Sequence, residues 1–381
     1  MEMKNVMFLA IFGALLVGCS EEEIANVETS SQNAISFNVV SNAAETKATP
    51  ITPSNLTTTD FDVFAYTADG TAFMGVADKA FLHDGVKIVY KGGKWDYDDP
   101  SELRYWPTKA LDFYAVSPAS LVNNDRANHY TWNFNHDSQQ IFYTCLDEYN
   151  TTILDSDKHA NHDVMYGIAK EQTRNSNNGK VHFKFKHILS QVVFKAKKEL
   201  LANMNVTISS IKIMNLYKSG TFTLPTSATD APSSSNWAPG LKAKSSGTVV
   251  RMGEDITVSN DGISISMDQP LLTIPQTLTA WNVKNTETKT KAKADDAGQS
   301  YLEISCKIQQ AGVYLCGSAD GDGTIYVPFG ASWEPGKRYI YTMIFGGGYD
   351  ENGDEILKPI EFEAETEDWV DDAGNDHEVN M

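Results

Sequence analysis

One stretch of the sequence combines acidic and aromatic side chains in a way that suggests carbohydrate chemistry. Asp96 and Glu102 stand close in the sequence to Trp95, Tyr97 and Trp106. Enzymes that cleave glycosidic bonds use a pair of carboxyl groups beside the scissile bond, often with aromatic rings as platforms for the sugar. The stretch therefore offers two alternatives: a glycan hydrolase that uses Asp96 and Glu102, or a binding surface formed by the exposed rings.

The other groups that might bind a metal or a nucleotide are weaker. His159, His162 and Asp163 lie close together, but no helix is expected there and no third ligand is apparent. The segment Asp320-Gly-Asp-Gly323 lacks the downstream glutamate of a calcium loop and predicts a tight turn instead. No glycine-rich phosphate loop stands between a strand and a helix. We therefore expect no metal site and no cofactor.

The first residues have the pattern of a targeting segment. Lys4 precedes an apolar run from Val6 to Val17, which fits the ~7–15 residues of a signal peptide and falls short of a membrane span. The run ends in Gly18-Cys19 and resembles the lipobox of bacterial lipoproteins, in which the cysteine is acylated. The sequence thus predicts a signal peptide over residues 1–18 and lipidation of Cys19. The alternative is an ordinary secretory signal followed by an unrelated cysteine.

A polar tether is expected between this cysteine and the folded part. Residues 19–34 include the acidic run Glu21-Glu22-Glu23 and carry too little apolar surface to offset the entropy of ordering. The acidic run resembles a surface-export signal of gut anaerobes, or else it keeps the tether soluble. The net charge of −19 argues against nucleic acid and anionic membranes as partners, since both require clustered basic residues.

Alternation of apolar and polar residues predicts β-strands over almost the whole remaining chain. Segments such as Ile35 to Val39, Phe61 to Tyr66 and Val181 to Phe185 alternate in this way, and Gly, Asn and Asp clusters separate them. Short strands without helical crossovers favour antiparallel sandwiches. We expect an all-β protein with one domain over residues 35–178 and a second over 179–381. The polar stretch from Lys284 to Ser300 is expected to be a hairpin.

The cysteines do not predict a disulfide scaffold. Beyond Cys19 the chain has Cys145, Cys306 and Cys316, an odd and sparse set. Cys306 and Cys316 either pair across a hairpin or are small buried apolar residues.

Several segments, in order along the chain, resemble the fimbrillins and fimbrillin-like subunits of type V pili. Together they span most of the chain beyond the tether, and the first is the most specific. The matching segments are Arg104-Tyr-Trp-Pro107 with Leu111-Asp-Phe-Tyr-Ala-Val-Ser-Pro118, Asp163-Val-Met-Tyr-Gly167, Phe183-Lys-Phe-Lys-His187-Ile-Leu-Ser190, Leu271-Leu-Thr-Ile-Pro-Gln276, Trp333-Glu-Pro-Gly-Lys-Arg-Tyr339 and Asp368-Trp369. In this setting Trp106 is expected in a core, and His187 is expected to bond a neighbouring backbone group.

The resemblance implies two transthyretin-like antiparallel β-sandwich domains with Greek-key connections, and assembly by donor-strand exchange. In that family a protease removes the lipid anchor together with the first strand. The matching strand here contains Ile35, Phe37 and Val39, and the candidate cleavage site is Lys47-Ala48. Many family members have arginine at the cleavage site, so a strictly arginine-specific protease would not process this chain. An uncleaved subunit would stay lipid-bound as an anchor or terminator.

The groove left by that strand would accept a strand from another subunit. The C-terminal segment with Ile360, Phe362 and Ala364 alternates apolar and acidic residues and is the candidate donor; otherwise it is an ordinary last strand. The resemblance thus implies a non-enzymatic structural or adhesive subunit. Its expected partners are other pilus subunits, the outer membrane before cleavage, and a host protein or glycan. We expect a surface-exposed outer-membrane lipoprotein that passes into the fimbrium after processing.

Overall fold

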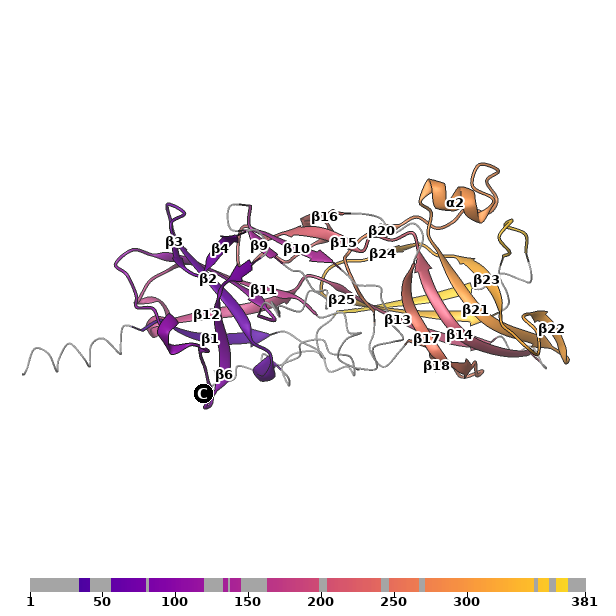
Figure 1. Cartoon of the computed structure of the whole chain (residues 1–381), viewed down its shortest axis with the longest axis horizontal. Coiled ribbons are helices and arrows are strands. Elements are labelled where there is room, and N and C mark those ends of the chain that lie inside the picture. Colours follow the sequence, from indigo (N-terminus) through magenta and orange to yellow (C-terminus); the bar gives the residue numbers. More distant parts are fainter. Residues whose placement is uncertain are drawn as a thin grey trace, which may run out of the picture.

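The chain folds into a row of β-sheets, with a closed sheet at one end and a two-layer sandwich at the other (Figure 1). The computed structural model describes residues 34–41, 56–79, 82–119, 133–135, 138–144, 163–198, 204–240, 247–266, 271–345, 349–355 and 361–368. Strands make up most of these residues, so the expected all-β class is confirmed. Within this described part, no helix is both long and apolar enough to cross a membrane.

The N-terminal sheet closes on itself. Its eight strands follow the order β3-β2-β6-β7-β1-β12-β11-β8, and an additional pairing of β2 with β8 completes a ring. Strands β4 and β5 form a separate pair. The bounds are β1 Ser36–Ser41, β2 Phe61–Thr67, β3 Ala72–Met74, β4 Val76–Lys79, β5 Leu82–Asp84, β6 Val86–Lys91, β7 Lys94–Tyr97, β8 Leu111–Ser117, β11 Met165–Gln172 and β12 Lys180–His187.

Alternation along the strands fills this ring with apolar side chains. In β12, Val181, Phe183 and Phe185 are buried, whereas Lys180, His182 and Lys184 on the other face are exposed. Successive side chains of a strand point to opposite faces, so every second residue enters the interior. The ring core gathers aromatic residues from distant strands, among them Phe37, Phe61, Trp95, Tyr97, Trp106, Phe113, Phe183 and Phe185.

A smaller four-stranded sheet shares a second core with the N-terminal ring. Its strands are β9 Asn133–Asn135, β10 Gln140–Thr144, β15 Ser219–Thr223 and β16 Trp237–Pro239, in the order β16-β15-β10-β9. Phe222 and Trp237 pack in this core with Tyr114 and Tyr166 of the ring. Two of the strands come from the first half of the chain and two from the second.

These pairings do not follow the expected division between residues 178 and 179. Strand β12 begins at Lys180, yet it pairs with β1 and β11 inside the N-terminal ring. Strand β15 lies further along the chain and pairs with β10 of the first half. The polar stretch before Lys180 is only the turn between β11 and β12, including a 3₁₀ turn at Ser176–Gly179. The change from ring to sandwich comes between His187 and Ser190, where β12 ends and β13 starts.

The C-terminal sandwich has two sheets. One sheet has the order β18-β13-β25-β26, with β19 also on β13, and the other has the order β17-β14-β21-β22, with β23 also on β21. A short pair, β20 with β24, lies beside them. The bounds are β13 Ser190–Lys198, β14 Met204–Met214, β17 Thr248–Thr257, β18 Ile263–Ser264, β19 Leu271–Thr273, β20 Thr277–Leu278, β21 Tyr301–Gln310, β22 Val313–Cys316, β23 Gly323–Pro328, β24 Ala331–Ser332, β25 Lys337–Phe345 and β26 Glu361–Asp368.

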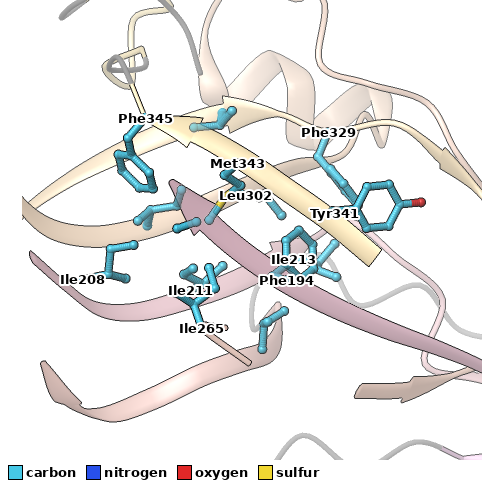
Figure 2. Close-up of a cluster of buried hydrophobic side chains, with 14 of the residues drawn as sticks. Phe194, Ile208, Ile211, Ile213, Ile265, Leu302, Phe329, Tyr341, Met343 and Phe345 are labelled. Carbon is cyan, nitrogen blue, oxygen red and sulfur yellow. The ribbon is translucent and has the colours of Figure 1, made fainter. Parts of the chain in front are cut away.

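The inner faces of these two sheets form one apolar core. Figure 2 shows side chains from both layers pointing toward one another, including Phe194, Ile208, Met343 and Phe345. The Phe194 ring stacks on that of Tyr341, with centroids 5.5 Å apart. Because this core is independent of the ring core, each end of the molecule has its own apolar interior.

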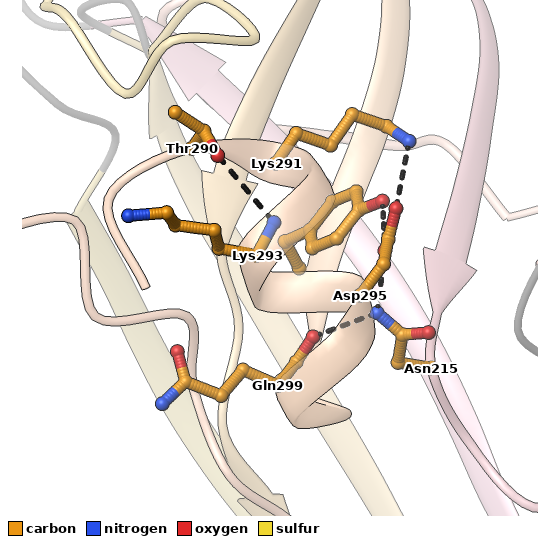
Figure 3. Close-up of polar contacts among 7 residues, drawn as sticks. Asn215, Thr290, Lys291, Lys293, Asp295 and Gln299 are labelled. Atoms are coloured by element: carbon orange, nitrogen blue, oxygen red, sulfur yellow. Dashed lines mark hydrogen bonds and ion pairs between the residues drawn. The ribbon is translucent and has the colours of Figure 1, made fainter. Parts of the chain in front are cut away.

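The stretch from Lys284 to Ser300 was expected to be a hairpin, and that prediction is wrong. It contains the helix α2, Lys291–Ala297. Thr290 accepts a hydrogen bond from the backbone N–H of Lys293 at 3.4 Å and caps the start, and Gly298 ends the helix at φ 66°. Asp295 fixes the helix to the sheet by accepting bonds from Asn215 Nδ2 at 2.8 Å and Tyr301 Oη at 2.7 Å (Figure 3).

Candidate functional site

The candidate site is the position of β1 in the N-terminal ring. Strand β1 runs parallel to β12 with six residue pairs, from Ser36 opposite Lys180 to Ser41 opposite Phe185. On its other side it meets β7, where Phe37 lies opposite Trp95. We call the space that β1 fills between β7 and β12 the β1 groove. Since β1 links these two strands, its removal would open the ring.

Three alternate side chains, two in β1 and one directly before it, enter the ring core, as the sequence predicted. Ile35, Phe37 and Val39 are all buried. The Phe37 ring stacks on Phe183, with centroids 6.2 Å apart and planes inclined by 10°, and it meets Tyr97 edge-on at 5.8 Å. Aromatic pairs of this kind add to the energy of burying their area. The Phe37 position is therefore a shaped aromatic pocket.

Polar contacts fix the start of the strand. The backbone N–H of Ile35 donates to the carbonyl of Arg104 at 2.9 Å, and Tyr97 Oη donates to the carbonyl of Ile35 at 3.2 Å. Burial raises the pKa of Tyr97, which keeps its hydroxyl protonated and able to donate. These contacts set the register in which an extended segment lies in the β1 groove.

The outer face of the β1 groove is basic along β12. Lys180, His182 and Lys184 are exposed there, and they lie opposite Ser36, Asn38 and Val40 of β1. Asn38 Nδ2 lies 3.3 Å from His182 Nδ1. On the β7 side, Lys94 and Asp96 form an ion pair with each other at 3.1 Å. Sequence reasoning did not identify this row, although the alternation over residues 180–187 contained it.

The candidate cleavage site follows β1, which is an interior strand of the closed sheet. The candidate cleavage residues Lys47 and Ala48 fall between β1 and the 3₁₀ turn at Leu56–Thr58, outside the described residues. Cys19 also falls outside them. The chain nevertheless re-enters the ring at β2, so the segment with Lys47 joins β1 to everything that follows.

The candidate donor segment has a different setting. Ile360 lies outside the described residues, whereas Phe362 and Ala364 belong to β26. Among the described strands, β26 pairs with β25 alone and forms the edge of its sheet. The side chains from Glu363 to Thr366 are exposed. An edge strand with exposed side chains on both faces costs less to detach than one that fills a core.

The proposed sugar platform is contradicted. Trp95, Tyr97 and Trp106 are all buried in the ring core, so none offers a flat surface to a ligand. Trp106 Nε1 donates to the carbonyl of Gly179 at 3.0 Å, which ties the Trp-Pro segment to the start of β12. Asp96 is the ion-pair partner of Lys94, and its Oδ1 accepts the backbone N–H of Tyr97 at 2.9 Å. Because these rings are buried, they also cannot serve as sugar platforms for a hydrolase.

The structure pairs His187 with an acidic side chain that the sequence analysis had considered separately. His187 was expected to bond a backbone group, but its Nδ1 lies 2.7 Å from Oδ2 of Asp163, with both side chains buried. Two of the family-like segments thus meet where β11 begins and β12 ends. His159 and His162 fall outside the described residues. In the described part of the chain, no group of three His, Cys, Asp or Glu side chains is arranged to hold a metal.

The two C-terminal cysteines are buried free thiols in the structure. They share a hydrogen bond between their side chains, which raises the pKa of Cys306 and lowers that of Cys316. Gly323 lies opposite Cys306 in the sheet, and a Cβ at Gly323 would come within 2.6 Å of Cys316 Sγ. The missing side chain at Gly323 therefore makes room for the Cys316 sulfur.

Comparison with known proteins agrees with this arrangement. A family model described as fimbrillin-like matches residues 46–369. The fimbrium subunit Fim1C of Phocaeicola vulgatus is 23% identical over 210 residues, and the match spans 50% of this chain and 50% of that protein. The crystal structure of a fimbrial protein from Bacteroides vulgatus is similar with a TM-score of 0.51 and 17% identity. That match covers 89% of this chain and 100% of the other, and it shows a shared fold.

Proposed function

The chain belongs to the fimbrillin-like family, and we propose that it is a structural or adhesive subunit of a type V pilus that assembles by donor-strand exchange after proteolysis. The observation that carries this proposal is the place of β1 in the ring. Strand β1 and the preceding Ile35 supply three buried side chains, and β1 bridges β7 and β12, so their removal leaves an apolar groove. Such a groove is completed by an extended segment of another molecule.

The burial free energy that is lost when β1 leaves the ring is large enough to drive assembly when another strand restores it. Burying an aliphatic or aromatic side chain stabilises a protein by roughly 1.5–3 kcal/mol, so Ile35, Phe37 and Val39 together contribute roughly 5–9 kcal/mol. Whole domains are stable by only about 5–15 kcal/mol. A subunit without β1 is therefore held close to unfolding until another strand fills the groove.

Proteolysis at Lys47-Ala48 would start this process. The bond lies between β1 and the rest of the chain, so cleavage leaves β1 attached only by its contacts in the ring. The cleavage also separates the chain from Cys19, the proposed lipid anchor. In this scheme the precursor is a surface-exposed lipoprotein of the outer membrane, and the processed subunit belongs to the fimbrium.

The donor strand is supplied by another pilus subunit. Within this chain the matching element is β26. Its side chains from Glu363 to Thr366 are exposed, and among the described strands it pairs with β25 alone, which suits a strand that leaves one partner for another. A host protein or glycan is the proposed target of the finished fimbrium.

Controlled cleavage tests this proposal. Purified precursor is treated with a lysine-specific protease, and cleavage at Lys47 is followed by N-terminal sequencing. We expect an SDS-resistant ladder to appear as the bond is cut. The matched control is Lys47→Gln, which keeps the polar loop but cannot be cleaved there and should stay monomeric. Complete cleavage of the natural chain with only a monomer band would contradict assembly by this route.

A further inference from the structure

We propose that Cys306 and Cys316 form a modification site at which a small disulfide from outside the cell converts the two thiols into a Cys306–Cys316 disulfide. Cys316 attacks the external disulfide first, and Cys306 then completes the bond within the chain. The site belongs to the C-terminal sandwich and does not involve the β1 groove, so it goes beyond the proposed function.

The first support is the proximity of the two sulfur atoms. Cys306 lies on β21 opposite Gly323 of β23, whereas Cys316 is the last residue of β22. The two cysteines are not opposite each other in the sheet, yet their side chains share a hydrogen bond within the sandwich core. The sulfur atoms are therefore neighbours in the folded chain, as a disulfide bond of about 2.05 Å requires.

Two glycines make this proximity possible. A Cβ at Gly323 would come within 2.6 Å of Cys316 Sγ and within 2.5 Å of the backbone nitrogen of Gly317. Gly317 has a φ of 76°, and a Cβ there would come within 2.9 Å of the backbone nitrogen of Gly323. Glycine permits both the positive φ and the close approach of the two backbones. This close approach holds Cys316 next to Cys306.

The two thiols differ in their access to solvent and in their acidity. Cys306 is fully buried, with 0% of its surface exposed, whereas Cys316 keeps 8%. The Cys306 thiol and the backbone N–H of Gly317 donate to the Cys316 sulfur and lower the pKa of Cys316. The shared hydrogen bond and burial raise the pKa of Cys306. Since the thiolate is the attacking form, Cys316 is the residue that an external disulfide meets first.

One acidic side chain near the pair acts against the thiolate. The charge of Asp322 raises the pKa of both cysteines. Lys307 Nζ lies 4.0 Å from Asp322 Oδ1 and offsets part of this charge. For Cys316 the hydrogen bond from Cys306 has the larger effect, so the pKa of Cys316 is still lowered.

The reaction has two steps of thiol–disulfide exchange. In the first step, the Cys316 thiolate attacks one sulfur of the external disulfide, whose S–S bond breaks and releases one half. In the second step, the Cys306 sulfur loses its proton and attacks Cys316 Sγ, and the other half leaves. The two cysteines are oxidised by two electrons, the external disulfide is reduced to two thiols, and the two cysteine protons end on those thiols.

The new bond would fix the edge strand β22, which lies at the end of the molecule away from the ring (Figure 1). Among the described strands, β22 pairs with β21 alone, over three residue pairs. Its residues Val313 and Tyr314 expose 62% and 36% of their surfaces, so few apolar contacts hold this strand. A disulfide at Cys316 closes a short loop and opposes the opening of β22.

Oxidation of the full chain by oxidised glutathione tests this proposal. The chain is reduced, freed of reductant, treated with oxidised glutathione and sampled over time by acid quenching and non-reducing peptide mapping. We expect glutathione on Cys316 in the earliest samples and the Cys306–Cys316 bond in the later ones. The control variant Cys19→Ser with Cys145→Ser removes the other two cysteines and should leave this course unchanged.

Two single variants separate the roles of the thiols. In Cys306→Ser, glutathione should accumulate on Cys316, because no thiol remains to displace it. In Cys316→Ser, glutathione should join Cys306 at least about tenfold more slowly, the factor that one pKa unit makes in the thiolate fraction. A cooperative urea transition shows that each variant is folded, and the time course of the natural chain gives the order of the steps without them.

The outcomes that overturn the proposal are distinct. They are glutathione that stays on Cys316 of the natural chain without a bond to Cys306, a bond from Cys316 to Cys145 instead, or no reaction in the folded chain when the urea-unfolded chain reacts. Amide hydrogen exchange at residues 313–315 tests the effect on β22. Exchange there should slow by about tenfold after oxidation, since the bond opposes local opening; an unchanged rate would overturn the effect on this strand.

Discussion

At the scale of single residues, Phe37 helps to hold the first strand in place through its buried aromatic contacts. Its ring is buried and lies among Phe61, Tyr97 and Phe183. We expect Phe37→Ala to lower the free energy of unfolding of the precursor by about 3–5 kcal/mol, because the change removes apolar contacts and leaves a cavity. Urea denaturation measures this loss. The neighbouring Asn38→Ala faces outward and should change the value by less than about 1 kcal/mol; equal losses for both variants would contradict the pocket.

The two buried cysteines should differ in reactivity. The hydrogen bond from the Cys306 thiol favours the thiolate of Cys316 and lowers its pKa, whereas the pKa of Cys306 is raised. The thiolate is the nucleophile, so limiting iodoacetamide should label Cys316 before Cys306 in the folded chain. Peptide mapping by mass spectrometry measures the order. Faster labelling of Cys306 would show that the shared hydrogen bond runs the other way.

The sequence predicted the facing of residues well and their partners poorly. Alternation alone identified Ile35, Phe37 and Val39 as inward-facing, since this follows from the geometry of a strand. The partners Tyr97 and Phe183 are set by pairings between strands far apart in the chain, which local pattern does not encode. The same limit explains why an exposed platform of Trp95 and Tyr97 stayed open as an alternative. Their aromatic character was plain, but their burial depends on closure of the ring.

At the scale of elements, β26 should be dispensable for folding and required for donation. Truncation after Leu357 removes β26 from the edge of its sheet. We expect the truncated chain to fold, as judged by a cooperative urea transition, and after cleavage at Lys47 to accept a strand without offering one. Added to full-length chains, it should shorten the ladder in proportion to its amount. Ladders of unchanged length would mean that another segment is the donor.

Helix α2 is an element that local sequence signals could have predicted. Thr290 before Lys291–Ala297 and Gly298 after it are the residue types that begin and end helices, yet the polar composition of the stretch favoured a hairpin interpretation. The domain boundary had no comparable local signal. Strand β12 belongs to the ring because it pairs with β1, a partner more than a hundred residues earlier. The turn-forming residues before Lys180 indicate only that a strand ends there. They do not indicate which sheet the next strand joins.

At the scale of the whole molecule, buried tyrosines make the fold sensitive to alkaline pH. Burial raises the pKa of Tyr341 to about 12, and it also raises the pKa values of Tyr97, Tyr166 and Tyr301. The unfolded chain loses these protons near pH 10, whereas the folded chain retains them. The contribution of these protonated tyrosines to the free energy of unfolding is therefore complete below about pH 10, and it is lost as the pH rises toward about 12.

Because the folded chain loses this stabilisation at alkaline pH, its urea midpoint should fall above about pH 10. We expect a stable midpoint between neutral pH and about 9, then a steep decline through about 11. Replacement of the exposed Tyr105 by phenylalanine should leave the decline unchanged, because its hydroxyl already lies in water. A midpoint that stays level across this range would contradict the burial of the four phenols.

The central claim is that a strand from a second copy replaces β1 beside β12, and cross-linking tests it most directly. If β26 lies in the groove with Phe362 in the place of Phe37, Glu363 takes the place of Asn38, which lies opposite His182. Chains carrying Glu363→Cys are therefore mixed with chains carrying His182→Cys. Adjacent strands lie ~4.8 Å apart, within the reach of a disulfide. The account predicts a disulfide-linked dimer that forms only after cleavage at Lys47 and fails with Lys284→Cys in place of His182→Cys. Complete cleavage without the His182 cross-link, or equal cross-linking before and after cleavage, would contradict it.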